Sequence, residues 1–171
     1  SYYANANTAV GSKALYSSTT GANNTANGYQ AMYSNISGNE NTAIGVGVLY
    51  SNIRGEFNVA IRMNSLHSNT TGRFNTAMGN SALFSDTSGS NNTAIGFGAG
   101  YNTFGNANVF SGFNAGRGET GSNKLFISNS QTDAANTLVY GEFDNKLLQI
   151  NGRLKINVPA TTVGLDLGAA A

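Results

Sequence analysis

The side chains that could carry out catalysis are few in this chain and form no recognisable constellation. His67 is the only histidine, so a serine–histidine–aspartate triad would depend on it alone. Glu142 and Asp144 share one face of a predicted strand and could hold a cation between subunits, but a surface pair beside a turn is the simpler interpretation. The other acidic residues are scattered. We therefore expect no enzyme activity, no catalytic residue, no metal site and no cofactor.

A column of aromatic residues offers ligand contact instead of catalysis. An aromatic residue or histidine recurs every 17 residues and would form a ladder in space if successive repeats stack. Rows of rings suit stacking on sugar rings or packing on a partner surface, although such rings could equally clamp a coil corner or a subunit interface. The candidate ligand-contact residues are Tyr16, Tyr33, Tyr50, His67, Phe84 and Tyr101.

A column of threonines suggests a different class of function. Regular threonine arrays on flat solenoids can bind ice, provided that the threonines are exposed. The threonines in question are Thr8, Thr25, Thr42, Thr76 and Thr93, and the column is broken by Val59 and Val109.

All of these columns arise from a 17-residue repeat that begins with Asn-Thr-Ala in most copies. A fixed period indicates a solenoid, because each unit must bury its apolar side on its neighbours. The leading asparagines are expected to form a structural ladder in which stacked amides hydrogen-bond to one another and to the backbone. They are Asn7, Asn24, Asn41, Asn58, Asn75, Asn92 and, after a one-residue contraction, Asn108.

Two glycine columns mark two corners in each repeat. The first column, which includes Gly28 and Gly45, predicts a positive φ in most units, with Arg62 as the exception. The second column includes Gly38 and Gly55 and follows a polar stretch. Two corners leave room for two extended segments of about five residues. We therefore predict one coil of a parallel β-roll per repeat, and about seven coils in a roll about 30 Å long.

The strand of each repeat has apolar or β-branched side chains on both of its faces. Thr42 and Ile44 point to one side and Ala43 to the other, because successive side chains of a strand alternate. A single thin coil covers only one such face. We therefore infer that the second face packs against other copies of the chain, and the pattern leaves open which face that is.

The composition excludes several kinds of partner. The chain has 171 residues with no cysteine, 10% charged residues and a net charge of +1. Such a charge provides no electrostatic footprint for nucleic acid or an anionic membrane. No apolar run approaches the roughly 20 residues of a membrane span, so we expect no direct membrane insertion.

The repeats resemble a known family. Asn-Thr-Ala-Ile-Gly at 41–45 and 92–96, together with Ala-Leu at 14–15 and 82–83, is similar to the head repeats of YadA-like trimeric autotransporter adhesins and to related repeats of bacteriophage tail fibres. The resemblance covers roughly residues 7–122. It implies a left-handed parallel β-roll that assembles as an intertwined homotrimer, located outside the cell on a bacterial surface or on the fibre of a phage or injection particle. The 17-residue unit is longer than the repeat common in those heads.

The repeat stops after Gly121, and a strand-rich segment follows. Residues 124–127, 137–143, 146–150 and 153–158 are predicted strands. Asp144-Asn145 and Asn151-Gly152 are hairpin-turn signals. We divide the chain into a β-roll at 1–122, a connector at 123–158 that forms a small trimeric β-prism, and a tail at 159–171 that is frayed or artificial.

Together these features predict a non-enzymatic, trimeric fibre or adhesin segment that projects from a surface and binds a glycan or protein receptor by avidity. The alternatives are a receptor-binding tail fibre of a phage or contractile injection particle, an ice-binding solenoid, and a tailspike-like glycan hydrolase. The hydrolase would need two carboxylates about 5 to 9 Å apart in a groove, and the repeats supply no such pair on one coil.

Overall fold

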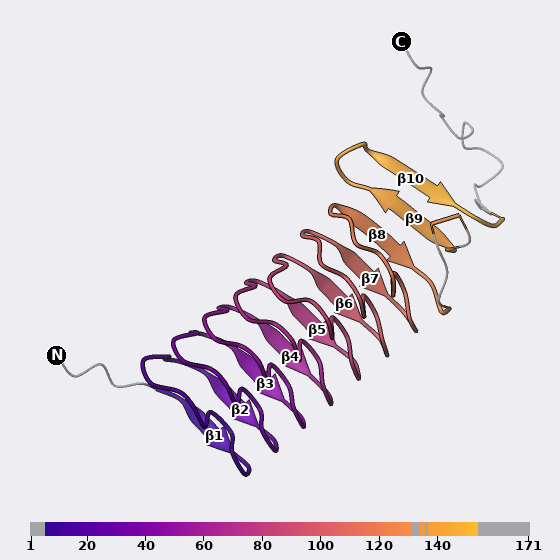
Figure 1. Ribbon diagram of the computed structural model, residues 1–171. Coiled ribbons are helices and arrows are strands. Elements are labelled where there is room, and N and C mark those ends of the chain that lie inside the picture. The colour runs from indigo at the N-terminus through magenta and orange to yellow at the C-terminus, as the bar shows by residue number, and fades with distance from the viewer. Residues whose placement is uncertain (1–5, 131–133, 136, 154–171) are drawn as a thin grey trace, which may run out of the picture.

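The computed structural model describes residues 6–130, 134–135 and 137–153. This part of the chain contains no helix and folds as one ten-stranded sheet whose spatial order follows the sequence (Figure 1). The strands are β1 (Thr8–Val10), β2 (Thr25–Asn27), β3 (Thr42–Ile44), β4 (Val59–Ile61), β5 (Thr76–Met78), β6 (Thr93–Ile95), β7 (Val109–Ser111), β8 (Lys124–Ile127), β9 (Val139–Glu142) and β10 (Leu147–Ile150).

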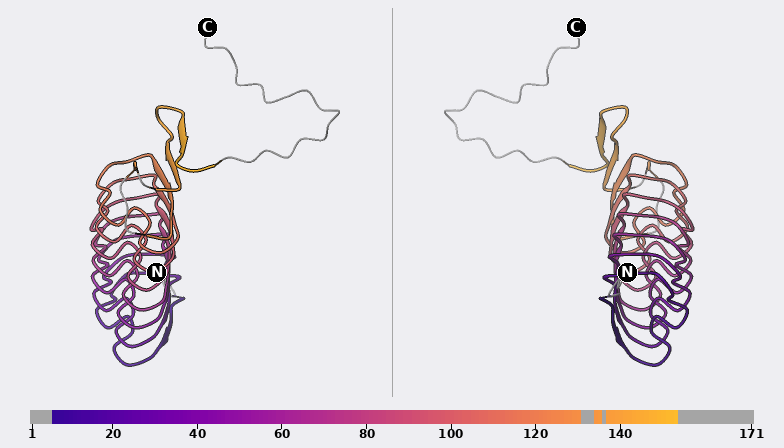
Figure 2. Two further views of the ribbon diagram at one scale, coloured as in Figure 1. Left: turned by 90° about the vertical axis from the view of Figure 1, so that its right-hand side faces the viewer. Right: turned by 90° about the vertical axis from the view of Figure 1, so that its left-hand side faces the viewer.

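Strands β1 to β8 pair in parallel, with equivalent residues of successive repeats side by side. Ala26 lies opposite Ala43, for example, and Thr42 lies opposite Val59. Each repeat is therefore one coil of a parallel β-solenoid, as the period predicts. Figure 2 shows the strands in a flat layer along one side of the roll and the turn segments along the other.

Each coil has one strand of three residues, where the sequence analysis expects two of about five. The reason lies in the backbone of the turn side. Gln30 and Met32 have φ angles of 56° and 53°, and their counterparts in the other coils are similar. Alternating residues in the left-handed region cannot form an extended strand. These turns are stabilised by hydrogen bonds between coils, such as Leu49 N–H to the carbonyl of Ser65 at 3.1 Å.

The two glycine columns serve different purposes. The first column has the expected positive φ at Gly28 and Gly45, and Arg62 adopts a φ of 89° at the same position. Gly38 of the second column has no positive φ. A Cβ atom there would lie 2.4 Å from the carbonyl oxygen of Gly55 in the next coil. The second column therefore allows close approach of adjacent coils.

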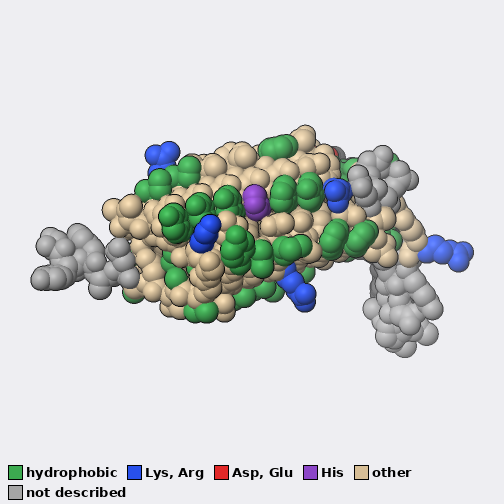
Figure 3. Space-filling model, turned by 60° about the horizontal axis from the view of Figure 1, so that its bottom comes forward, with side chains coloured by type: hydrophobic (Ala, Val, Ile, Leu, Met, Phe, Trp, Pro, Cys, Tyr) green, Lys and Arg blue, Asp and Glu red, His purple; other side chains and the backbone are tan. Residues whose placement is uncertain are grey.

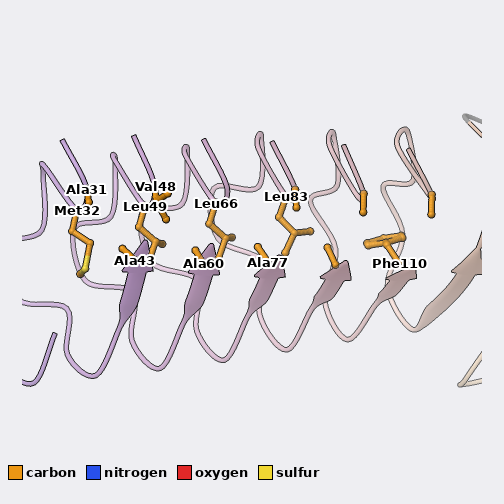
Figure 4. Close-up of a cluster of buried hydrophobic side chains, with 14 of the residues drawn as sticks. Ala31, Met32, Ala43, Val48, Leu49, Ala60, Leu66, Ala77, Leu83 and Phe110 are labelled. Atoms are coloured by element: carbon orange, nitrogen blue, oxygen red, sulfur yellow. The ribbon is translucent and has the colours of Figure 1, made fainter. Parts of the chain in front are cut away.

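The alanine face of the strands is the interior of the roll. Ala43, Ala60 and Ala77 are fully buried, and the turn side supplies Leu49 and Leu66, also fully buried, to pack against them. Figure 4 shows these leucines pointing from the turn segments toward the alanines on the strands. The other strand face, which carries the threonines and the isoleucines, is therefore the outer one. The alternating pattern of the sequence leaves open which strand face fills the coil, and the structure shows that it is the alanine face.

The sheet continues without interruption past the last repeat. Strand β8 pairs in parallel with β7, and β9 and β10 then add in antiparallel fashion. The turn signal Asp144-Asn145 is confirmed, since residues 143–146 connect β9 to β10. Most of the predicted strand at 153–158 and the tail at 159–171 lie outside the described residues. The sheet itself has no break at residue 122, where the sequence analysis divides the roll from the connector.

Candidate functional site

The leading asparagines form a continuous ladder inside the roll, as predicted. From Asn7 to Asn92, each side-chain oxygen accepts a hydrogen bond from the backbone N–H of the asparagine one coil later, at 3.0 Å from Asn58 to Asn41, and Asn108 accepts from the N–H of Lys124 at 2.9 Å. Each side-chain amide donates to a glycine carbonyl of the second column, at 2.8 Å from Asn41 to Gly55. From Asn24 to Asn108 these side chains are at most 1% exposed. From Asn24 onward this ladder is a structural element shielded from solvent.

A second buried amide ladder was not predicted. Asn52 donates to Asn35 at 2.9 Å, and Asn69 donates to Asn52 at 2.8 Å. All three are fully buried. The fourth position of this column is Asp86, whose carboxylate accepts backbone hydrogen bonds from Gly89 at 2.6 Å and Ser88 at 3.2 Å. The signal was present in the sequence as asparagines at 35, 52 and 69, which have the same 17-residue spacing.

The aromatic column forms the predicted ladder. The rings from Tyr16 to Tyr101 stack with centroids 5.0 to 5.1 Å apart and planes within 15° of parallel. His67 lies within the stack, between Tyr50 and Phe84, and burial lowers its pKa. The guanidinium of Arg117 covers the last ring, 4.3 Å from the centroid of Tyr101. In Figure 3 the purple histidine interrupts a row of green side chains that runs along the roll.

This stacking limits what the aromatic ladder offers a ligand. The faces of the interior rings are covered by their neighbours, so these rings present edges and hydroxyl groups. Tyr16, at 66% exposed, is the most accessible ring of the ladder. The ladder therefore suits contact with a polar, hydrogen-bonding surface better than the stacking of sugars on ring faces.

Two apolar columns, one on the outer side of the sheet and one on the turn that follows each strand, form a surface that we call the outer face. The first is aliphatic and interrupted by Asn27 and Ser111; its members are Val10, Ile44, Ile61, Met78 and Ile95, followed on β8 by Ile127. The second runs beside it and comprises Tyr29, Val46, Met63, Phe97 and Phe113, with Asn80 between Met63 and Phe97. All of them except Ile61 are exposed, at 39% to 54%. Neither column contains a charged residue, and Arg62 lies between them in the glycine column.

The threonine column lies on the same side of the sheet. Thr25, Thr42, Thr76 and Thr93 are half-buried between neighbouring coils. Bulky aliphatic side chains stand two residues away on every strand except β2 and β7, where Asn27 and Ser111 take their place. The threonines are thus part of a mainly apolar surface.

Of the two acidic residues at the hairpin, Glu142 connects β8, β9 and the turn, and Asp144 does not. Glu142 accepts hydrogen bonds from the Tyr140 hydroxyl at 2.5 Å and from the Asn145 side chain, and forms an ion pair with Lys124 at 3.1 Å. These donors, with Tyr140 first, lower the pKa of Glu142 to about 2. Asp144 accepts the backbone N–H of Asn145 at 3.1 Å instead of joining Glu142. Across the described residues, no group of three or more His, Asp or Glu side chains is placed to hold a metal ion.

The fold and these ladders define a parallel β-solenoid with an apolar outer face. Comparisons with protein-family models, with curated proteins and with solved structures find no match to this chain. Within the described ranges, the structure has no helix of the length and apolarity needed to cross a membrane.

The asparagine ladder should contribute strongly to stability. Asn41→Ala leaves the Asn58 N–H buried without a partner and removes one of the two hydrogen bonds to the Gly55 carbonyl, which keeps the bond from Asn52. An unpaired buried group costs about 1 to 3 kcal/mol. We expect the melting temperature to fall by roughly 5 to 10 °C. Asn102→Ala is the control, because Asn102 is exposed and its side chain accepts a single hydrogen bond at the surface, from the Ser85 hydroxyl at 3.0 Å. Equal melting temperatures for the two variants would contradict a stabilising ladder.

Asp86 should make stability depend on pH. Burial raises the pKa of its carboxyl, against the opposing effect of hydrogen bonds from Gly89, Ser88 and Asn92. The Asp86 carboxyl therefore binds its proton more tightly in the folded chain than in the unfolded chain. The contribution of Asp86 to stability is complete below its unfolded pKa, near 3.8, and is lost as the pH rises through the folded value.

Asp86→Asn removes the cost of ionising a buried carboxyl, and the new amide can donate to Asn69 as Asn69 donates to Asn52. We expect the variant to be more stable than the wild type at neutral pH by about 1 kcal/mol, with a smaller difference in acid. Thermal melts across the acidic and neutral range measure this difference. Asp144→Asn, at an exposed turn, is the control. A stability difference that does not change with pH would contradict the assignment.

Proposed function

We propose that this chain is a segment of a non-enzymatic, homotrimeric fibre that projects from a surface and binds a glycan or protein receptor through several weak contacts at once. The observation that carries the proposal is the outer face. Monomeric proteins seldom leave a continuous apolar surface of this length in water. Here it runs along all coils of a solenoid whose own interior is already filled by alanines and leucines.

Assembly through the outer face explains why both faces of each strand are apolar. The alanine face fills the coil, and the outer face is covered by neighbouring copies. The aromatic ladder lies on the turn segments and belongs to neither column of the outer face. It is therefore the candidate for receptor contact.

Repetition supplies the binding mechanism. Three copies of a roll present each surface residue three times, and the backbone ladders hold these copies at a fixed spacing. Linked weak contacts of this kind strengthen overall binding by about 10²- to 10⁴-fold. The same argument supports a bacterial adhesin and a receptor-binding fibre of a phage or injection particle, and both are located outside the cell.

The two remaining functions have less support. Ice binding requires an exposed, regular threonine surface, and these threonines are half-buried beside bulky aliphatic side chains. Glycan hydrolysis requires paired carboxylates in a groove. The acids Asp86 and Glu142 are both committed to hydrogen bonds within the chain.

The assembly proposal predicts a particle of about three times the chain mass of 17.7 kDa. Met78→Glu places a charge on the outer face, where burial against a neighbour would be costly, so we expect it to produce monomers. Ile36→Glu is the matched control, since Ile36 is 45% and Met78 43% exposed, but Ile36 lies outside the outer face. Light scattering after gel filtration measures both. A wild-type monomer, or equal behaviour of the two variants, would contradict assembly through this face.

The binding proposal is tested on arrays of glycans and surface proteins. The wild-type assembly should bind at least about 10²-fold more tightly than Met78→Glu monomers. Replacing Tyr33 and Tyr50 by serine should weaken binding without changing the particle mass. Phe104→Ser is the control, at a 53% exposed ring outside the ladder. Degradation of any glycan on the array would instead identify a hydrolase.

A further inference from the structure

We infer that the ligand of the aromatic ladder is an extended, neutral polysaccharide of β-1,4-linked sugars, which lies along the roll with one sugar beside each coil from Tyr16 to His67. This inference rests on the proposed receptor binding and goes further, because it names the class of ligand and the part of the ladder that holds it.

The aromatic ladder is a straight row of evenly spaced groups. Its neighbouring ring centroids are 5.0 to 5.1 Å apart from Tyr16 to Tyr101, and successive ring planes differ by 4° to 15°. Equivalent atoms therefore repeat along the roll with little rotation from one coil to the next. A polymer that advances by the same distance per unit can place an equivalent group beside every coil.

The tips of the tyrosine rings are available for hydrogen bonds. Within the described ranges, the hydroxyl groups of Tyr33 and Tyr50 have no partner in the chain, and the one buried side-chain nitrogen or oxygen atom without a partner is Asn80 Oδ1. The two tyrosine hydroxyls are therefore not buried in the chain. Hydroxyl groups of a sugar can donate to them and accept from them.

A column of serines runs beside the aromatic ladder. The residue after each ring is a serine in the first five coils, and these serines are half-buried: Ser17, Ser34, Ser51, Ser68 and Ser85. Each of these coils therefore offers a ligand a ring edge and a hydroxyl group side by side. Neither column has a charged residue between Tyr16 and Tyr101, so the site favours a neutral ligand.

The interval favours a polysaccharide over a polypeptide. Side chains on one face recur about every 6.6 to 6.8 Å along an extended strand, and about every 4.5 or 6 Å along a helix. Neither distance matches the coil interval, so the contacts of a polypeptide would fall out of step along the ladder. A β-1,4-linked chain passes through opposite corners of each sugar ring, and each sugar advances by nearly the length of one coil. Its hydroxyl groups can then meet every coil in turn.

The polar tips occupy only part of the ladder. Tyr16, Tyr33 and Tyr50 end in hydroxyl groups and His67 carries ring nitrogens, whereas Phe84 has no polar side-chain atom. Tyr101 lies beyond Phe84, and the guanidinium of Arg117 covers its ring. The site for the polysaccharide is therefore the four coils from Tyr16 to His67.

The length of the ligand tests this site. Calorimetric titration of the chain with β-1,4-linked oligomers of glucose and of N-acetylglucosamine, from disaccharide to octasaccharide, measures the affinity per chain. We expect the affinity for at least one series to rise with length up to the tetrasaccharide and then to level off. Oligomers of α-1,4-linked glucose, which curve, should bind more weakly by about tenfold or more.

Removing hydroxyl groups tests the contacts. Tyr33→Phe combined with Tyr50→Phe removes two hydroxyls and keeps both rings in the stack. We expect the affinity for the tetrasaccharide to fall by about tenfold or more, while the melting temperature stays unchanged. Tyr29→Phe, which removes a hydroxyl from a 46% exposed ring outside the ladder, is the matched control and should change neither.

Adding a hydroxyl group tests the end of the site. Phe84→Tyr supplies the missing polar tip and joins the row to Tyr101. We expect the affinity of this variant to keep rising with length up to the hexasaccharide. Phe104→Tyr adds a hydroxyl to a 53% exposed ring outside the ladder and should keep the wild-type dependence on length.

The outcomes separate this inference from the proposed function. A wild-type assembly that binds receptors on the arrays but neither β-1,4-linked series, or binds proteins alone, overturns the polysaccharide assignment and leaves receptor binding in place. An affinity that the double phenylalanine variant leaves unchanged overturns the placement on the ladder. A monomeric wild-type chain that binds the tetrasaccharide overturns the proposed assembly and supports this site. Absence of binding in every assay overturns both.

Discussion

The hydrogen bonds that the leading asparagines make between coils are the interaction on which this fold depends. A coil of one three-residue strand and a series of turns leaves many backbone groups without a strand partner. The Asn58 side chain accepts a hydrogen bond from the backbone N–H of Asn75 in the following coil and donates one to the carbonyl of Gly72 in its own coil. The equivalent asparagines bond in the same way. Because the side-chain amide must reach the same two groups in every coil, the repeat length is held nearly constant. The contraction before Asn108 is tolerated because its bond to Asn92 is kept, at 3.0 Å.

This constraint explains which parts of the fold follow from the sequence. The period, the asparagine ladder and the parallel stacking depend on residues that recur at every coil, so they are predictable. The single strand per coil is not, because it results from positive φ angles at residues such as Met32 and Leu49 that carry no sequence signal for that conformation. Their side chains are buried, and packing in the interior outweighs their local backbone preference. The second amide ladder was missed for a different reason, since its asparagines begin no conspicuous motif.

The interior also accommodates one large residue in the column that is otherwise alanine. Phe110 occupies the alanine column, and the leucine column has glycine at Gly100 and Gly116 beside it. A Cβ atom at these glycines would lie 2.6 and 2.2 Å from the Phe110 ring. Large and small residues have thus exchanged places across the coil, which keeps the interior volume nearly constant. The aromatic ladder could be predicted only in part. The positions of its residues follow from the 17-residue spacing, but the covering of each ring face by the next ring is visible only in the structure.

The larger apolar side chains of the repeat are divided between the interior and the outer face. The interior relies largely on alanine, which buries little area, while larger aliphatic and aromatic side chains stand on the outer face at about half exposure. Covering one of these larger side chains contributes about 1 kcal/mol, so covering both columns contributes on the order of 10 kcal/mol per copy. This gain is comparable to the whole stability of a typical domain and exceeds the lower estimates of the entropic cost of association. A roll built in this way would gain much of its stability from any surface that covers the outer face.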